Sequence, residues 1–149
     1  MKEVLTCYSV YDNEVGYVQG MNLIAANLLY HVKLAEETFW ALVDLMENRE
    51  LRMIYTGKME YLGVHCANID SLMSKSLPKI HTFMGDLGIN SRVFLDGWVL
   101  SLMSKVIPLE SMHLVINNFK KKGWNFIYQL IIQIIKGLGA CLLMSEDEP

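Results

Sequence analysis

Residues 8–22 read YSVYDNEVGYVQGMN, and this stretch decides how the rest of the chain is interpreted. It is polar as far as Gly20, whereas Met21 begins an apolar run typical of a helix. Gly16 and Gly20 permit backbone angles that are closed to other residues, or the close approach of another chain. The pattern predicts a polar loop that leads into an apolar helix, with Gln19 held between the two glycines near the helix start.

The side chain of Gln19 is suited to a particular task in phosphate chemistry. A helix start offers free backbone N–H groups and the positive end of the helix dipole, so it favours an anionic partner such as a nucleotide phosphate. A glutamine amide is no general base near neutral pH, but it can accept a hydrogen bond from a water molecule while donating to a phosphate oxygen. That arrangement positions the attacking water in GTP hydrolysis. Taken alone, Gly-x-x-Gln-Gly is more often a structural turn.

Helical periodicity recurs along the chain and predicts an all-α fold of roughly seven or eight helices of ordinary length. Proline disfavours helical geometry in the preceding residue, so Leu77, before Pro78, is a predicted boundary. Asp96-Gly97 is a weak hairpin signal, because its flanks do not alternate between apolar and polar residues. The helical stripes are Phe39, Leu42, Val43 and Met46; Met112, Val115, Ile116 and Phe119; and the start of a third, Ile69, Leu72 and Met73.

Charged residues mark the ends of two predicted helices. The glutamates at 36–37 lie where the first turn of a helix favours negative charge. The lysines at 120–122 precede Gly123, as expected for a cationic last turn followed by a glycine C-cap. We interpret these lysines as a solvated helix end in preference to a phosphate-binding patch.

Composition and charge exclude several classes of function. The chain is 52% hydrophobic and 19% charged, which excludes a disordered segment. A formal net charge of -3 without a basic stripe argues against nucleic-acid binding. The four histidines and the widely spaced Cys7, Cys66 and Cys141 provide neither metal-ligand spacing nor a disulfide framework. We expect free, mostly buried thiols, a cytoplasmic location and no metal site.

Residues 124–144 are apolar enough to raise the question of a membrane span. They include Asn125, Gln129, Gln133 and Lys136. A charged residue at the centre of a bilayer costs on the order of 2.5–3.5 kcal/mol. A buried core helix is therefore the preferred interpretation, and no direct membrane span is expected.

The stretch at residues 8–22 closely resembles the TBC-domain signature around its catalytic glutamine, usually written Tyr-Cys-Gln-Gly-Met, with Val18 at the cysteine position. Four later segments resemble other parts of that domain in the same order, so the resemblance covers nearly the whole chain. They are residues 35–46, similar to its AFW helix; LPKIHTFMGDLGI at 77–89, similar to its Leu-Pro-x-Leu stretch; GWVLSLMSKVIPLE at 97–110, similar to its Trp-Phe and Pro segment; and KKGWNFIYQLIIQIIK at 121–136, similar to its Glu-Gly-x-x-x-Leu-Phe helix.

This resemblance implies a two-lobed, all-α TBC domain that activates Rab-family small GTPases in vesicle trafficking. Residues 1–60 would form the glutamine-finger lobe, incomplete at its N-terminal side, and residues 61–149 the C-terminal helical lobe. Gln19 would be the catalytic glutamine finger, supplied in trans to a partner that carries GTP and magnesium, so this chain needs no cofactor. The chain would meet membranes only peripherally, through the Rab. The residues expected to contact the GTPase are Tyr17, Gly20 and Asn22.

An arginine that the resemblance leads one to expect is missing. In TBC domains an arginine finger neutralises developing charge, and its Ile-x-x-Asp-x-x-Arg motif lies upstream of the glutamine. The arginines here, Arg49, Arg52 and Arg92, all follow Gln19. An arginine finger is worth about 10³–10⁵ in rate, or roughly 4–7 kcal/mol of barrier, which a glutamine alone does not recover. We expect either the larger C-terminal part of a TBC domain or an inactive relative that still binds.

Two other classes of function therefore stay open. One is a non-catalytic module that binds a GTPase through the same face. The other is a helical scaffold, which exposed aromatic anchors at Phe94, Trp98 and Tyr128 would favour, although core packing is the commoner role of such residues.

A second departure lies at residues 115–118, VINN, where TBC domains often carry Arg-x-Trp-Asp. We expect altered core packing there.

Overall fold

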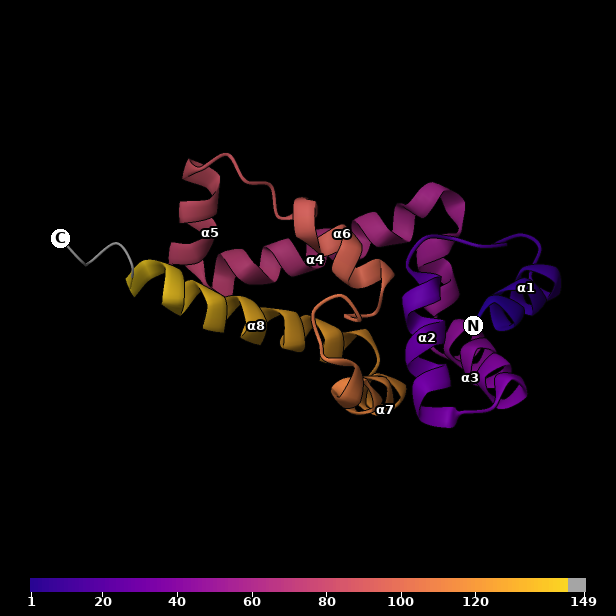
Figure 1. Ribbon diagram of the computed structural model, residues 1–149. Coiled ribbons are helices and arrows are strands. Elements are labelled where there is room, and N and C mark those ends of the chain that lie inside the picture. The colour runs from indigo at the N-terminus through magenta and orange to yellow at the C-terminus, as the bar shows by residue number, and fades with distance from the viewer. Residues whose placement is uncertain (145–149) are drawn as a thin grey trace.

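The computed structural model describes the backbone of residues 1–144 and the side chains of residues 1–139 other than Lys58. This part of the chain is helical and contains no strand, which confirms the predicted all-α class (Figure 1). The elements are α1 (Lys2–Tyr11), α2 (Met21–Val32), α3 (Ala35–Asn48), η1 (Leu51–Tyr55), η2 (Gly57–Met59), α4 (Glu60–Ser76), α5 (Pro78–Asp86), α6 (Arg92–Leu100), η3 (Leu109–Ser111), α7 (Met112–Lys122) and α8 (Trp124–Met144).

Several helices begin or end at the residues that local sequence signals predict. Leu77 separates α4 from α5 and has φ -134° and ψ 52°, outside the helical region. Gly123 follows the lysines of α7 with φ 62°, in the left-handed region that glycine adopts readily. The glutamates at 36–37 lie in the first turn of α3. The pair at 96–97 lies within α6, so it forms no hairpin turn.

The predicted apolar stripes face the interior, with one exception. In α7 all four predicted residues are buried, and in α3 only Phe39 remains half-buried. In α4 the buried seam is narrower than predicted, and Leu72 is 36% exposed. The reason is that α4 packs along a single row of its surface, which Leu72 flanks. That row consists of Leu62, Cys66, Ile69 and Met73.

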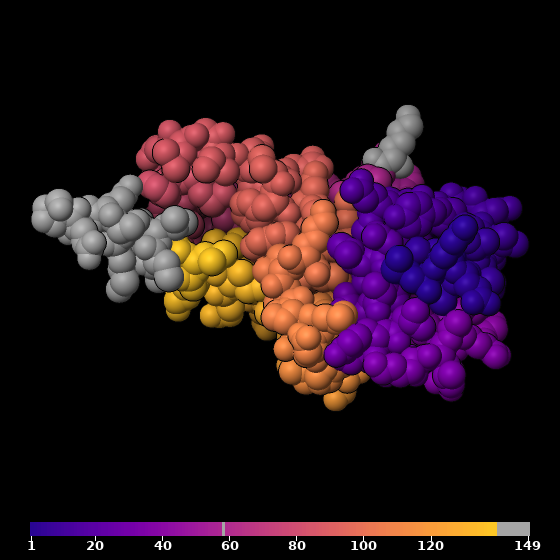
Figure 2. Space-filling model, viewed as in Figure 1, coloured from indigo at the N-terminus to yellow at the C-terminus, as the bar shows by residue number. Residues whose placement is uncertain are grey.

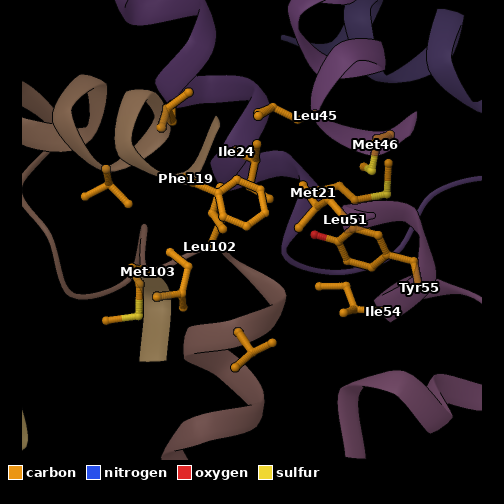
Figure 3. Packing of buried hydrophobic residues seen from close by; sticks show 14 of the residues in the cluster. Met21, Ile24, Leu45, Met46, Leu51, Ile54, Tyr55, Leu102, Met103 and Phe119 are labelled. Carbon is orange, nitrogen blue, oxygen red and sulfur yellow. The ribbon is translucent and has the colours of Figure 1, made fainter. Parts of the chain in front are cut away.

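One core joins the N-terminal helices to the C-terminal ones. Phe119 of α7 is fully buried, and its ring lies between Ile24 of α2 and Leu102 of the segment after α6 (Figure 3). Met21, Leu51 and neighbouring side chains of η1 continue this core to one side. Truncating a buried phenylalanine of this kind typically costs about 3–5 kcal/mol. The buried contacts therefore connect segments almost a hundred residues apart in sequence, roughly the span from α2 to α7.

The helices are arranged around two centres of packing. α1, α2 and α3 pack together, while α4 contacts η1 near its start and α5, α6 and α8 farther along (Figure 1). α7 contacts both α2 and α8, and in Figure 2 its orange surface directly adjoins the purple surface of α2. The division into lobes at residues 1–60 and 61–149 stays a prediction.

α8 is the apolar helix that raised the question of a membrane span. It packs against α4 and α7 through a row of buried isoleucines, Ile127, Ile131 and Ile135. Within residues 1–144 no helix combines the length and apolar character required to cross a bilayer. The presence of Lys136 and other polar residues in α8 agrees with the interpretation of this helix as one that packs through one side.

Candidate functional site

Residues 12–20 form the loop between α1 and α2, called here the Gln19 loop, and its first residues are held by Asp12. The carboxylate of Asp12 accepts hydrogen bonds from the Tyr8 hydroxyl at 3.1 Å and from the backbone N–H of Val15 at 3.3 Å. The backbone oxygen of Asp12 also accepts the N–H of Gly16 at 2.8 Å. These bonds close a tight turn directly after α1, so the loop leaves the helix in a defined direction.

Arg52 of η1 fastens the same turn from a distant part of the chain. Its Nε lies 2.6 Å from Oδ2 of Asp12 and its Nη2 lies 3.0 Å from Oδ1, a bidentate arrangement. The same Nη2 donates to Glu14 at 2.6 Å. The guanidinium holds the pKa of Asp12 below its usual range, and these carboxylates raise the pKa of Arg52. Asp12 and Glu14 are therefore ion-pair partners of Arg52.

The other end of the loop is fixed by close packing on α6. Gly20 is buried, with φ 110°, and a Cβ on it would lie 2.6 Å from the backbone oxygen of Leu100. That oxygen also accepts the hydroxyl of Tyr55 at 2.7 Å. The close approach that the glycine pattern predicts is therefore made by a later part of the same chain. Sequence reasoning gave no signal for Leu100 or Tyr55, because both lie far away in sequence.

Between these anchors the loop presents Tyr17 and Gln19 outward. Tyr17 is 54% exposed, and Gln19 is exposed in the turn that immediately precedes α2. The hydrogen bonds of the described residues engage the backbone of Val18 and Gly20 on either side, but not the Gln19 amide. Gln19 thus lies near a helix start, as predicted, and its side chain is exposed. The side chain is free to donate and accept hydrogen bonds with a partner.

The backbone donors at the start of α2 are mostly occupied, so fewer N–H groups are free there than predicted. Gly20 N–H donates to Oδ1 of Asn22 at 3.2 Å, and Met21 N–H donates to the oxygen of Val18 at 3.2 Å. The amides of residues 23 and 24 both reach the oxygen of Gly20. The tight turn satisfies these groups internally, and Asn22 serves to close it. What the site offers a partner is the Gln19 side chain.

Among the described side chains, the other titratable groups give no second reactive centre. Burial lowers the pKa of His65 to about 4, and its Nδ1 lies 2.6 Å from the Tyr128 hydroxyl oxygen. Burial raises the pKa of the Cys66 thiol to about 12, so it is a poor nucleophile. Cys7 is exposed, against the expectation of mostly buried thiols, and Cys141 lies outside the described side chains. In the described part of the chain no histidine, cysteine or carboxylate cluster could hold a metal ion.

The three aromatic residues considered as exposed scaffold anchors are half-buried. Phe94, Trp98 and Tyr128 all pack against the core. Phe94 and Trp98 lie on one helix with ring centroids 5.0 Å apart. Core packing is therefore their observed role, which leaves the scaffold hypothesis without its main support.

Comparison with known proteins places this geometry in a family. The family model of the Rab-GTPase-TBC domain matches residues 1–143. The chain belongs to the Rab-GTPase-TBC domain family. The match includes the whole Gln19 loop and both of its anchors.

Curated relatives of this Rab-GTPase-TBC domain are much longer proteins. The chain is 33% identical to the Rab GTPase-activating protein eat-17 of Caenorhabditis elegans. The alignment covers 97% of this chain and 16% of the length of eat-17. It is 36% identical to the GTPase-activating protein GYP5 of Saccharomyces cerevisiae, over 98% of this chain and 15% of that protein. The Rab GTPase-activating protein tbc-11 of C. elegans is 28% identical over 95% of this chain. The chain thus spans about a sixth of the relatives it matches.

The departure of this Rab-GTPase-TBC domain at residues 115–118 is accommodated in its core. Val115 and Ile116 are buried in α7, where they belong to the apolar stripe. Asn118 is partly exposed, and its side chain donates to the backbone oxygen of Leu114 at 2.9 Å. Apolar residues therefore fill this part of the α7 interface.

Proposed function

We propose that this chain supplies the glutamine finger of a GTPase-activating domain for Rab-family small GTPases. Support comes from the family match and from relatives that are themselves named Rab GTPase-activating proteins. The observation that carries the proposal is the setting of Gln19, an exposed amide on a loop fixed at both ends, with no hydrogen-bond partner among the described residues. A fixed loop holds a reacting group in place before the partner arrives, which lowers the entropic cost of positioning it.

In the proposed mechanism the Gln19 amide acts in trans on a nucleotide held by the partner. Its oxygen accepts a hydrogen bond from the attacking water, and its NH₂ group donates to a phosphate oxygen. The Rab supplies GTP and magnesium, so the chain itself needs no cofactor. Tyr17, exposed two residues earlier, is the side chain we assign to the GTPase contact, whereas Gly20 and Asn22 shape the turn beneath it.

Two of the three arginines, Arg52 and Arg92, are poorly placed to serve as an arginine finger. Arg52 is bound by Asp12 and Glu14, and Arg92 is paired with Asp96 at 3.2 Å on α6. Freeing Arg52 would also unfasten the loop that carries Gln19. This observation favours a second candidate function for the 149 residues alone, that of a GTPase-binding module with little catalytic power. In either case contact with membranes would be indirect, through the Rab, and no nucleic acid is involved.

Binding and hydrolysis measured together separate these functions. We would load a panel of Rab proteins with GTP or GDP, measure the affinity of the chain for each, and follow GTP hydrolysis at saturating chain. Preference for the GTP form with hydrolysis that depends on Gln19 supports the activator. Binding without a Gln19-dependent rate supports the binding module. No binding in either nucleotide state would contradict both, and would leave a scaffold without a GTPase partner.

A further inference from the structure

A polar cleft lies where the end of α3 meets the corner between α7 and α8, well separated in sequence from the Gln19 loop. It encloses about 300 Å³. We call it the Arg49 cleft. Its lining residues are Asn48, Arg49, Glu50, Lys122, Gly123, Trp124 and Asn125. The ion pair between Lys120 and Asp44, 2.7 Å apart, connects α7 to α3 near this place.

Arg49 is the arginine of this chain that lacks a carboxylate partner within the described residues. It follows α3 directly and is only partly exposed, and its Nε is buried without a hydrogen-bond acceptor. Asp44, the nearby acid on the same helix, is taken up by Lys120 and by the amide of Asn48. Lys120, which pairs directly with the carboxylate of Asp44, lowers the pKa of that group most, and the nearby charge of Arg49 helps to lower it. The Nε–H of this partly buried arginine is left without an acceptor, which is unfavourable and suits an added anion.

Trp124 provides a second, independent donor on the same cleft. It is only 9% exposed, and its Nε1–H has no acceptor among the described residues. Its ring packs against His65 and Phe119, with centroid distances of 3.9 Å and 5.3 Å. Trp124 is also the first residue of the 21-residue helix α8, whose N-terminal end carries positive partial charge.

We propose that the Arg49 cleft binds a phosphate monoester. Arg49, Lys122 and the start of α8 bring positive charge to it, and Glu50 is the only carboxylate among its lining residues. The residues that line it come from three chain segments, and such a set of donors suits a tetrahedral, doubly charged oxyanion better than a planar carboxylate. Of the three lysines at the end of α7, Lys122 thus belongs to a phosphate-binding site, the interpretation that the sequence left as the less favoured one. This site does not depend on the proposed action on a GTPase.

The indole N–H of Trp124 provides a direct readout of occupancy. The chain has three tryptophans, so a ¹⁵N-labelled sample shows three indole signals, and Trp124→Phe identifies the one that matters. We would titrate inorganic phosphate into the full chain at constant ionic strength. The Trp124 signal should shift saturably, while those of Trp40 and Trp98 stay in place. No saturable shift of the Trp124 signal would overturn the proposal.

Three variants test which side chains hold the anion. Arg49→Gln should weaken phosphate binding by about ten- to a hundredfold, since it removes a charged donor. Lys122→Gln, at an exposed position, should weaken it by a smaller factor and decides the matter if Arg49→Gln does not fold. Arg92→Gln, which removes an arginine already paired with Asp96, is the matched control and should leave affinity unchanged. Equal affinity in all three would assign the shift to adventitious ion binding and overturn the site.

Two further arms identify the kind of anion and its source. Acetate at equal concentration should leave the Trp124 signal in place, and an equal shift would overturn the phosphate assignment in favour of a carboxylate. Sedimentation with phosphatidylcholine vesicles, with and without a phosphatidylinositol phosphate, tests a lipid headgroup. Arg49-dependent sedimentation with the phosphorylated lipid supports the site with a membrane source. Phosphate binding without such sedimentation supports the site with a soluble phosphate ester as its ligand.

Discussion

Nε of Arg52 lies 2.6 Å from Oδ2 of Asp12, and this ion pair ties η1 to the first residue of the loop that carries Gln19. The side chains are 28% and 11% exposed, so the pair is partly withdrawn from water. Forty residues separate the partners in sequence. The position of the exposed glutamine therefore depends on the packing of a distant segment as well as on its own glycines.

Arg52→Ala should lower the free energy of unfolding by about 1–3 kcal/mol, because the half-buried carboxylate of Asp12 loses its charged donor. Urea denaturation measures the change. The matched control is Arg92→Ala, whose i,i+4 pair with Asp96 is more exposed and should matter by less than about 1 kcal/mol. Equal effects of the two substitutions would show that the loop is not fastened by Arg52.

Gly20→Ala should destabilise the fold by about 2–3 kcal/mol or more, because the new Cβ meets the backbone of Leu100 and the residue has a positive φ. Gly16→Ala is the control. Gly16 also has a positive φ, of 61°, but no atom lies within 4 Å of a Cβ there, so only about 1–2 kcal/mol of backbone strain is expected. Melting curves that rank Gly16→Ala as the worse variant would contradict the packing described.

The periodicity of apolar residues predicted the helices of this fold well, because the buried face of a helix is determined by residues that are close together in sequence. The α7 stripe is buried as its spacing indicates, and Leu77 falls between two helices because of the proline that follows. Leu72 was predicted to be buried and is exposed, since the width of a buried seam depends on which helices cover it. Partners such as Asp12 and Arg52, or Gly20 and Leu100, depend on tertiary packing and leave no local signal. The place of Gln19 before a helix was therefore predictable from the sequence, whereas the anchors of its loop were not.

Stability should also depend on pH through His65. The pKa of His65 is about 4 in the folded state, whereas its ordinary value is 6.5. Between these pH values the imidazole is protonated in the unfolded state but not in the folded state. The free energy of unfolding should therefore fall as the pH drops from about 6.5 towards 4. His65→Gln should flatten this slope, whereas His113→Gln, at an exposed position, should not. An unchanged slope in His65→Gln would contradict the burial effect.

The 149-residue chain should stimulate GTP hydrolysis by Rab proteins weakly or not at all. Its Arg52 and Arg92 are bound by carboxylates, and an arginine finger contributes about 10³–10⁵ in rate. A panel of GTP-loaded Rab proteins provides the measurement. Strong acceleration that disappears in Arg49→Ala or Arg52→Ala would show that one of these arginines acts as the finger after all.

The central claim is that Gln19 acts on the transition state and is not an anchor for the GTPase. The most direct test is the rate of GTP hydrolysis per bound complex at saturating protein, compared between the natural sequence and its Gln19→Ala variant. Where the gene encodes an Ile-x-x-Asp-x-x-Arg segment upstream, both proteins include it. Interactions made only in the transition state change turnover more than affinity. We therefore predict a sharp loss of turnover with nearly unchanged Rab affinity. Lost binding with intact turnover per complex would contradict the account.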